Sequence, residues 1–349
     1  NSIVLGGLHR TESELAKKNV LNEIVLGGNI QIQKGSWKLG AVGIHRNLSD
    51  SLSARTEWYA QDKFSGKSQG AIGMYAEGVW KNASLFGEIS RSSNGALASV
   101  AGVTAAIHSK VSGTVLFRDF DRNFQSVYSN VFAEGSSLFP SNEKGLYVGI
   151  QAQLNKKISV TAYSDGVQYP WLRYQVTAPS SFSDNLFQLN YKPDKKHEFY
   201  ARLRVRRTVI DHSVLNRIDF PVDKLSKQLR LNFIFSPLES LKLHSRLEWI
   251  KTNEEGLPNE FGYLVFQDLT WKKIGVPFSV TFRYALFQTD TWNARLYAYE
   301  NDVLYSYSIP AYYGKGARVY GIFKFDLKRN VDLWFRIAQW TYTDRNQIS

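Results

Sequence analysis

The chain has 349 residues, a formal net charge of +12 and no cysteine. The absence of cysteine excludes a disulfide framework and a zinc–thiolate site. No apolar run approaches the roughly 20 residues that a membrane-spanning helix needs. The basic excess favours polyanionic partners such as nucleic acid or lipid head groups, with an unevenly charged soluble surface as the alternative.

The first predicted element is a short helix near the start of the chain. Thr11 and Glu14 have the spacing of a capping box, in which the two residues satisfy free backbone N–H groups at a helix start. The stretch LAKKN follows and places Lys17 and Lys18 near the C-terminal end of this helix, where cations are favourable. We expect this short helix to lie in the first loop.

From residue 24 onward, apolar and polar residues alternate almost to the end of the chain. Ile24, Leu26, Ile30 and Ile32 share one face of the first such segment, because alternate side chains of a strand point to opposite faces. The sequence predicts roughly 16 segments of about 9–12 residues, the length of a tilted strand that crosses a bilayer. Further examples are 146–154, 187–191, 229–235, 241–249, 278–284 and 319–327.

The predicted connections also alternate, between short polar turns and long loops. Turns are predicted at 34–36, 81–82, 155–157, 193–196, 236–240 and 328–330. Long loops are predicted at 46–66, 121–142, 167–183, 208–224 and 288–316. Short turns at one end of the strands and long loops at the other are typical of outer-membrane barrels.

These patterns predict an all-β fold. We expect a transmembrane antiparallel up-and-down β-barrel of about 16 or more strands, with short turns on one side and long loops on the other. It would occupy residues 1–349 as a single domain and lie in the bacterial outer membrane. A soluble protein with several sheets is the alternative, because its strands alternate too.

The stretch EFYARLRVRRTVI, residues 198–210, places three arginines on one face of a predicted strand. In a membrane barrel the apolar face meets lipid, so these arginines would face the water-filled lumen. Cations of the next two strands fall on the same side. The predicted basic wall is Arg202, Arg204, Arg206, Arg230, Lys242 and Arg246.

Neighbouring like charges repel, so this wall needs compensation. One interpretation is a network of arginines and carboxylates that stiffens the wall or fixes a plug, with Glu248, Asp326 and Asp332 as candidate partners. The other interpretation is a path or docking face for a polyanion. Both remain open at this level.

No catalytic or cofactor motif is convincing. FSGKS at 64–68 resembles the end of a phosphate-binding loop, but Gln61 occupies the position of its first glycine. The six histidines lack metal-ligand spacing, and no GxSxG motif occurs. We therefore expect no enzyme, cofactor or metal site.

Four stretches carry a resemblance to a known family: 7–19 (GLHRTESELAKKN), 130–137 (NVFAEGSS), 169–180 (YPWLRYQVTAPS) and 297–320 (YAYENDVLYSYSIPAYYGKGARVY). The chain resembles outer-membrane barrels of Bacteroidota that carry helix-hairpin-helix repeats before the barrel. The resemblance implies an upstream helix-hairpin-helix region and further strands at both ends, so we expect the sequence to be incomplete at both ends.

Helix-hairpin-helix modules typically bind nucleic-acid backbones through loop N–H groups and helix N-termini. The first functional hypothesis is therefore a barrel that handles or translocates a polyanion, such as DNA. The alternative is a structural subunit of an outer-membrane secretion or assembly complex, with a plugged lumen. A nonspecific anion-preferring pore is a third hypothesis. Expected partners are the lipid bilayer, lipopolysaccharide, DNA and other outer-membrane or secretion-complex proteins.

Overall fold

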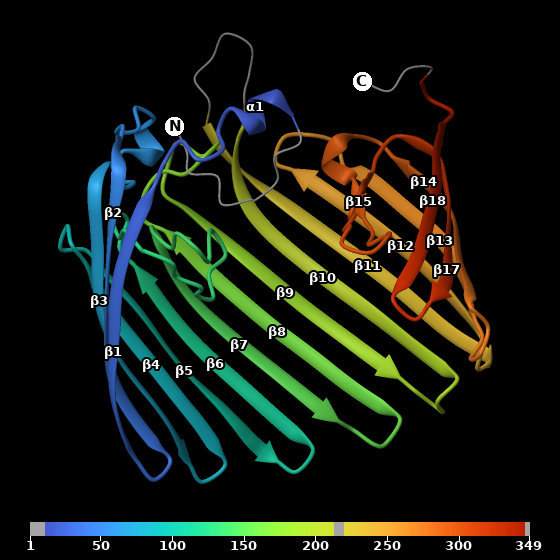
Figure 1. The fold of residues 1–349 in the computed structure, drawn as a ribbon, viewed down its shortest axis with the longest axis horizontal. Helices are drawn as coiled ribbons and strands as arrows, with labels where there is room; N and C mark the ends of the chain where they lie inside the picture. The colour runs from blue at the N-terminus through green and yellow to red at the C-terminus, as the bar shows by residue number, and fades with distance from the viewer. Residues whose placement is uncertain (1–10, 213–219, 346–349) are drawn as a thin grey trace. The chain divides into compact units, whose positions relative to one another are not determined.

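A computed structural model describes residues 11–212 and 220–345. Sixteen strands form one sheet in the order β1 to β14, followed by β17 and β18, and β15 and β16 form a separate two-stranded ladder (Figure 1). The strands are β1 (Glu23–Lys34), β2 (Trp37–Leu52), β3 (Gly66–Trp80), β4 (Ala83–Ser92), β5 (Leu97–His108), β6 (Val111–Phe120), β7 (Glu143–Gln153), β8 (Ile158–Tyr169), β9 (Ser180–Tyr191), β10 (His197–His212), β11 (Phe220–Leu238), β12 (Leu241–Glu254), β13 (Glu260–Lys272), β14 (Phe278–Thr289), β15 (Leu296–Tyr297), β16 (Ala311–Tyr312), β17 (Lys315–Lys328) and β18 (Val331–Tyr342).

The helices are short. Helix α1 (Glu12–Leu15) starts at the predicted capping residue, because the Thr11 side chain accepts a hydrogen bond from the Glu14 backbone N–H. The helix ends at Leu15, so Lys17 and Lys18 lie beyond it and not in its last turn. The other helices are the 3-10 turns η1 (Trp58–Ala60) and η2 (Trp292–Ala294). Within the described part of the chain, no helix is both long and apolar enough to cross a membrane.

The connections follow the predicted alternation, with some differences. Turns such as Gly35–Ser36 join strands at one end; Gly35 has a φ of 60°, which glycine adopts without steric cost. The predicted loop 208–224 is mostly strand, since β10 runs to His212 and β11 starts at Phe220. Two connections at the loop end, 93–96 and 255–259, are short as well. Residues 213–219, and the first four residues of the stretch 7–19, lie outside the described residues.

Side-chain exposure is inverted relative to a water-soluble sheet. Ile30 on β1 is 78% exposed, whereas Asp268 on β13 is 4% exposed. On β13, Tyr263 and Val265 are exposed while Leu264 and Phe266, on the opposite face, are buried. Many large exposed hydrophobic side chains are costly in water and favourable in a lipid bilayer. The strand arrangement and exposure pattern are those of a bacterial outer-membrane β-barrel protein, which confirms the predicted fold class and location.

The described residues belong to two compact units. Unit 1 takes its residues from Asn1–Gly149, Asp165–Ser183 and Val209–Pro221, and unit 2 from Ile150–Ser164, Asp184–Thr208 and Val222–Ser349. In unit 1, Phe120 and Phe124 pack with Ala96 and Ala98. Unit 2 has a larger core, which includes Leu264, Phe266, Phe287, Leu296 and Tyr312. The prediction of one barrel domain that continues past both ends stays a prediction.

Candidate functional site

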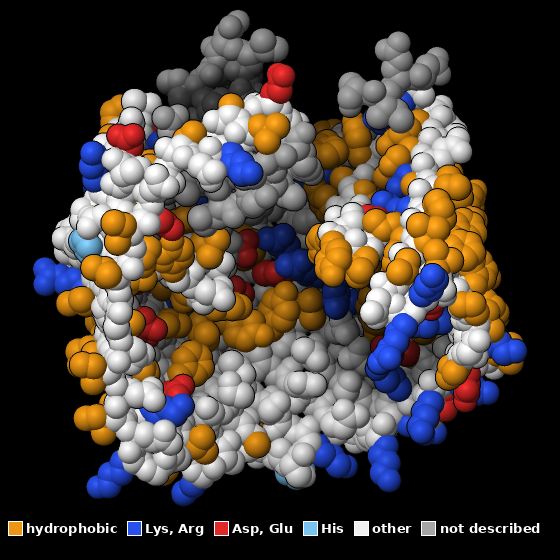
Figure 2. Space-filling view, in the orientation of Figure 1, with side chains coloured by type: hydrophobic (Ala, Val, Ile, Leu, Met, Phe, Trp, Pro, Cys, Tyr) orange, Lys and Arg blue, Asp and Glu red, His pale blue; other side chains and the backbone are white. Residues whose placement is uncertain are grey.

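The six residues of the predicted basic wall lie on β10, β11 and β12 of unit 2. Arg202, Arg204 and Arg206 alternate along β10, and all three are half-buried. Arg230 on β11 lies directly opposite Glu248 on β12. Figure 2 shows Lys and Arg side chains gathered where Figure 1 places β10 and β11. The name "basic wall" is used below for Arg202, Arg204, Arg206, Arg230, Lys242 and Arg246.

Asp184 on β9 compensates part of the positive charge of the arginine row on β10. Nε of Arg204 donates to Oδ1 of Asp184 at 2.9 Å, and its Nη2 donates to Oδ2. The hydroxyl of Tyr163 donates to the same Oδ2 at 3.2 Å, and Nε of Arg206 lies 4.0 Å from it. One buried carboxylate therefore faces two guanidinium groups.

Glu248 is the second carboxylate of the wall, and it is fully buried. It accepts two hydrogen bonds from Arg230, both at 2.8 Å, in the bidentate geometry that makes such pairs strong. Nη1 of Arg246 lies 3.9 Å from Oε2 of Glu248, and its guanidinium stacks 5.0 Å from the ring centre of Phe266. Glu248 was among the predicted partners, and the structure confirms it.

The other members of the wall differ in their surroundings. Nε of Arg202 donates to Oε1 of Gln188 at 2.6 Å, and no carboxylate of the described residues lies within ion-pair distance of it. Lys242 is exposed at the start of β12. The predicted partners Asp326 and Asp332 instead pair with Lys324, at 2.5 and 3.0 Å, because they flank the turn between β17 and β18.

Two long loops are held on the polar face of their own unit, by residues that the sequence analysis did not single out. In unit 1, Arg118 of β6 is fully buried, pairs with Glu143 and binds both oxygens of Asp165 at 2.9 and 3.0 Å. The Glu143 carboxylate in turn accepts hydrogen bonds from the backbone N–H groups of Glu134 and Gly135, at 3.0 and 2.9 Å. These contacts fix the loop at 121–142 on the strands.

In unit 2, the loop at 290–314 is held by Glu300, which is 0% exposed. Glu300 accepts two hydrogen bonds from Arg318 of β17, at 3.0 and 2.9 Å, and one from Arg336 of β18, at 2.5 Å. The hydroxyl of Tyr312 also donates to it, at 2.9 Å. Burial raises the pKa of Tyr312 above its ordinary value, and the neighbouring Glu300 adds to the shift, so the phenol stays protonated as a donor.

Sequence reasoning missed Asp184, Glu300 and the Arg118 network. Asp184 could have been found, because it continues the polar alternation of Gln188 and Asn190 toward the start of β9. Glu300 gave no such signal, since it lies in a loop without periodicity. Among the described residues, no cluster of three or more His, Cys, Asp or Glu side chains could hold a metal ion.

Comparison with known proteins gives likenesses of fold. No protein-family model and no curated protein matches the chain. Among solved structures, it is similar to outer-membrane expressed OmpT of Vibrio cholerae, with 7% identity, a TM-score of 0.41 and coverage of 91% of this chain and 96% of that one. It is also similar to OccK8 (OprE) of Pseudomonas aeruginosa, with 9% identity, a TM-score of 0.42 and 93% of each chain covered. OccK3 (OpdO) of the same organism has 9% identity and a TM-score of 0.42, covering 92% of this chain and 93% of that one.

Proposed function

We propose that the basic wall binds polyanions and that the protein handles or translocates them across the outer membrane, with DNA as the leading example. The observation that carries this proposal is a row of cations over three neighbouring strands of unit 2, β10, β11 and β12. Arg204 and Arg206 lie beside Asp184, and Arg230 and Arg246 lie beside Glu248. The side chains of Arg204 and Arg206 are 33% and 41% exposed, so solvent and solutes reach them.

The spacing of the arginines suits a phosphate chain. Alternate residues of an antiparallel strand lie about 6.8 Å apart. This is about twice the 3.4 Å axial rise between phosphates of one DNA strand. Guanidinium groups also bind phosphate oxygens through paired, charge-assisted hydrogen bonds. The wall would then act as an electrostatic track that does not read base sequence.

The resemblance of 297–320 to barrels with helix-hairpin-helix repeats supports the same proposal. In such a protein the upstream repeats would bind the nucleic-acid backbone first, and the wall would receive it afterwards. This argument rests on a resemblance to a family. It therefore suggests a DNA receptor upstream of the barrel but identifies no further binding residue in the barrel itself. No catalytic step is part of the proposal.

Replacing Arg202, Arg204 and Arg206 together by Ser tests the wall. We expect weaker binding of double-stranded DNA by the full chain in lipid vesicles. The slope of log affinity against log salt should fall in magnitude by about one for each lost phosphate contact. The matched control replaces Lys156, Lys157 and Lys195, in exposed turns, by Ser. Equal affinity and salt slope for the two triple variants would remove the wall from the proposal.

A second candidate function is favoured by the two loops held on the polar faces. Glu143 and Glu300 each fix a long loop on the polar face of the strands. Loops held in this way would plug a lumen, and a plugged lumen is what the hypothesis of a structural subunit in a secretion or assembly complex assumes. The single-channel conductance of the inserted full chain in a planar bilayer separates the two functions. Steady current that double-stranded DNA blocks supports transport. Absence of current, with insertion verified by protease protection, supports the structural subunit.

A further inference from the structure

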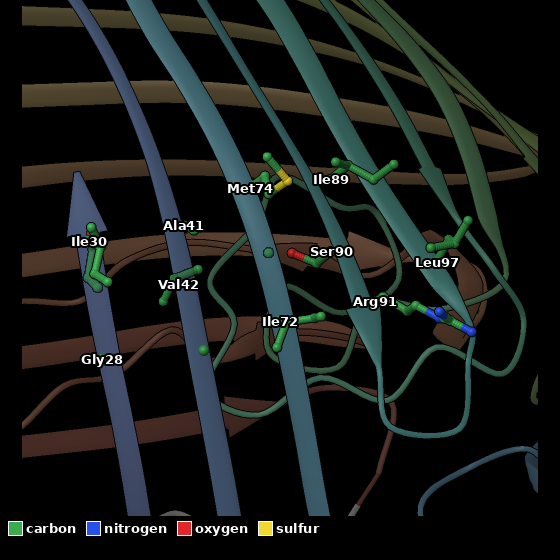
Figure 3. A pocket seen from close by; sticks show the side chains of 13 residues that line it. Gly28, Ile30, Ala41, Val42, Ile72, Met74, Ile89, Ser90, Arg91 and Leu97 are labelled. Atoms are coloured by element: carbon green, nitrogen blue, oxygen red, sulfur yellow. The ribbon is translucent and has the colours of Figure 1, made fainter. Parts of the chain in front are cut away.

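Unit 1 has a groove across strands β1 to β5 that the proposed function does not use. Its cavity volume is about 720 Å³, and its lining is almost wholly apolar. Figure 3 shows the side chains that form it, with Ile72 and Met74 on β3 and Ile89 on β4. Ile30, Ile72 and Met74 are 78%, 66% and 68% exposed, so these side chains belong to the lipid-facing side of the sheet.

The strand register explains why the surface is hollow there. Gly28 of β1 lies opposite Gly43 of β2, which lies opposite Ile72 of β3. The two glycines place no side chain in this row. A Cβ atom added at Gly28 would meet nothing within 4 Å, and one added at Gly43 would lie 3.8 Å from the nearest atom, Cγ2 of Ile72. Large side chains such as Ile30 and Met74 rise around this gap.

One charged side chain stands at the edge of the groove. Arg91 of β4 lies between Ile72 of β3 and Leu97 of β5 in the register, and it is exposed. The part of the chain that the structure describes provides no carboxylate within ion-pair distance of Arg91. An arginine on the lipid side is costly at mid-membrane but nearly free of cost near the head groups, where its guanidinium reaches the polar layer.

Arg91 lies at the end of its strand that carries the long loops. It lies two residues before the turn at 93–96, at the same end as the loops at 53–65 and 121–142. In outer-membrane barrels the long loops are extracellular, so this end faces the outer leaflet. The neighbouring lipid head groups are therefore those of the outer leaflet.

We propose that this groove is a binding site for one acyl chain of a phosphorylated outer-leaflet lipid, with Arg91 on its phosphate. The apolar gap over Gly28 and Gly43 takes the chain, which gains contacts that a flat sheet does not offer. The guanidinium of Arg91 pairs with the phosphate at the end of the groove. The two features are adjacent, so a single lipid molecule can use both.

Native mass spectrometry of the full chain, titrated with lipid A in detergent micelles, tests this site. We expect one saturable lipid A and weaker binding of dephosphorylated lipid A. R91Q should weaken lipid A binding about tenfold, as expected for the loss of a charge-assisted hydrogen bond, and R91K should restore most of it. K110Q, which removes a cation from the turn between β5 and β6, is the matched control and should bind as the original chain does.

Filling the groove tests the acyl-chain half of the proposal separately. G28L and G43L each place a side chain in the gap, and both should lower lipid A affinity with Arg91 intact. Two variants are used so that a folding defect in one does not decide the result. The proposal is overturned if R91Q and K110Q bind lipid A equally, if removal of the phosphates has no effect, or if well-folded G28L and G43L bind normally.

Discussion

Replacing Glu300 by Gln is expected to detach the loop at 290–314 and to destabilise unit 2 by about 3–5 kcal/mol. The glutamine keeps the shape of the side chain but removes its charge. Arg318 and Arg336, which both donate to Glu300, then lose a buried anion. The cost of a buried charge without its partner exceeds the net value of the original pair, which explains the size of the effect.

The free energy of unfolding in urea, measured in lipid vesicles, gives the expected loss, and limited proteolysis of the loop gives its location. Glu239→Gln, in the exposed turn between β11 and β12, is the matched control and should change stability little. Adding Arg318→Gln to Glu300→Gln should recover part of the loss, because Arg336 keeps its contact with Asp302 at 2.9 Å. Unchanged proteolysis of the loop in Glu300→Gln would refute the role of this contact.

Replacing Arg118 by Gln is expected to have an effect of similar size in unit 1, about 3–5 kcal/mol. Arg118 is fully buried, and its loss leaves Glu143 and Asp165 without their common cation. Glu143 also holds the backbone of Glu134 and Gly135. We therefore expect faster hydrogen exchange in the loop at 121–142 together with the loss of stability.

Arg122→Gln is the matched control for this prediction. Arg122 pairs with Asp62 at 3.3 Å, but its side chain is half exposed, so its loss should cost at most about 1 kcal/mol. Adding Asp165→Asn to Arg118→Gln should restore part of the stability, since one of the two uncompensated charges disappears. Equal unfolding midpoints for Arg118→Gln and Arg122→Gln would contradict the proposed role of the buried network.

Several features of the fold could be predicted from the sequence because they depend on neighbours along the chain. The alternation of Ile24, Leu26, Ile30 and Ile32 predicted a strand with one lipid-facing side, and β1 has this arrangement. The same period of two placed Arg202, Arg204 and Arg206 on one face of β10. Thr11 and Glu14 predicted the start of α1, since a helix cap is made within a few residues.

The predictions from neighbouring residues failed at the ends of two elements, β10 and α1. The predicted loop at 208–224 is mostly strand, because the alternation of Thr208, Ile210 and His212 is too mixed to show that β10 continues. Lys17 and Lys18 lie past the end of α1, since a capping box fixes where a helix begins and not where it ends. The two-residue alternation and the capping box therefore predicted the type of an element, and the face on which its side chains lie, more reliably than its length.

Only the tertiary structure decided which charges meet and which surfaces are hollow. Asp184 and Arg204 come from different strands, and Glu300 reaches Arg318 from a loop that has no periodicity. The groove exists because the register brings Gly28 opposite Gly43. Alternation along one strand fixes the side on which a residue lies, whereas its partner depends on the register between strands and on where the loops pack.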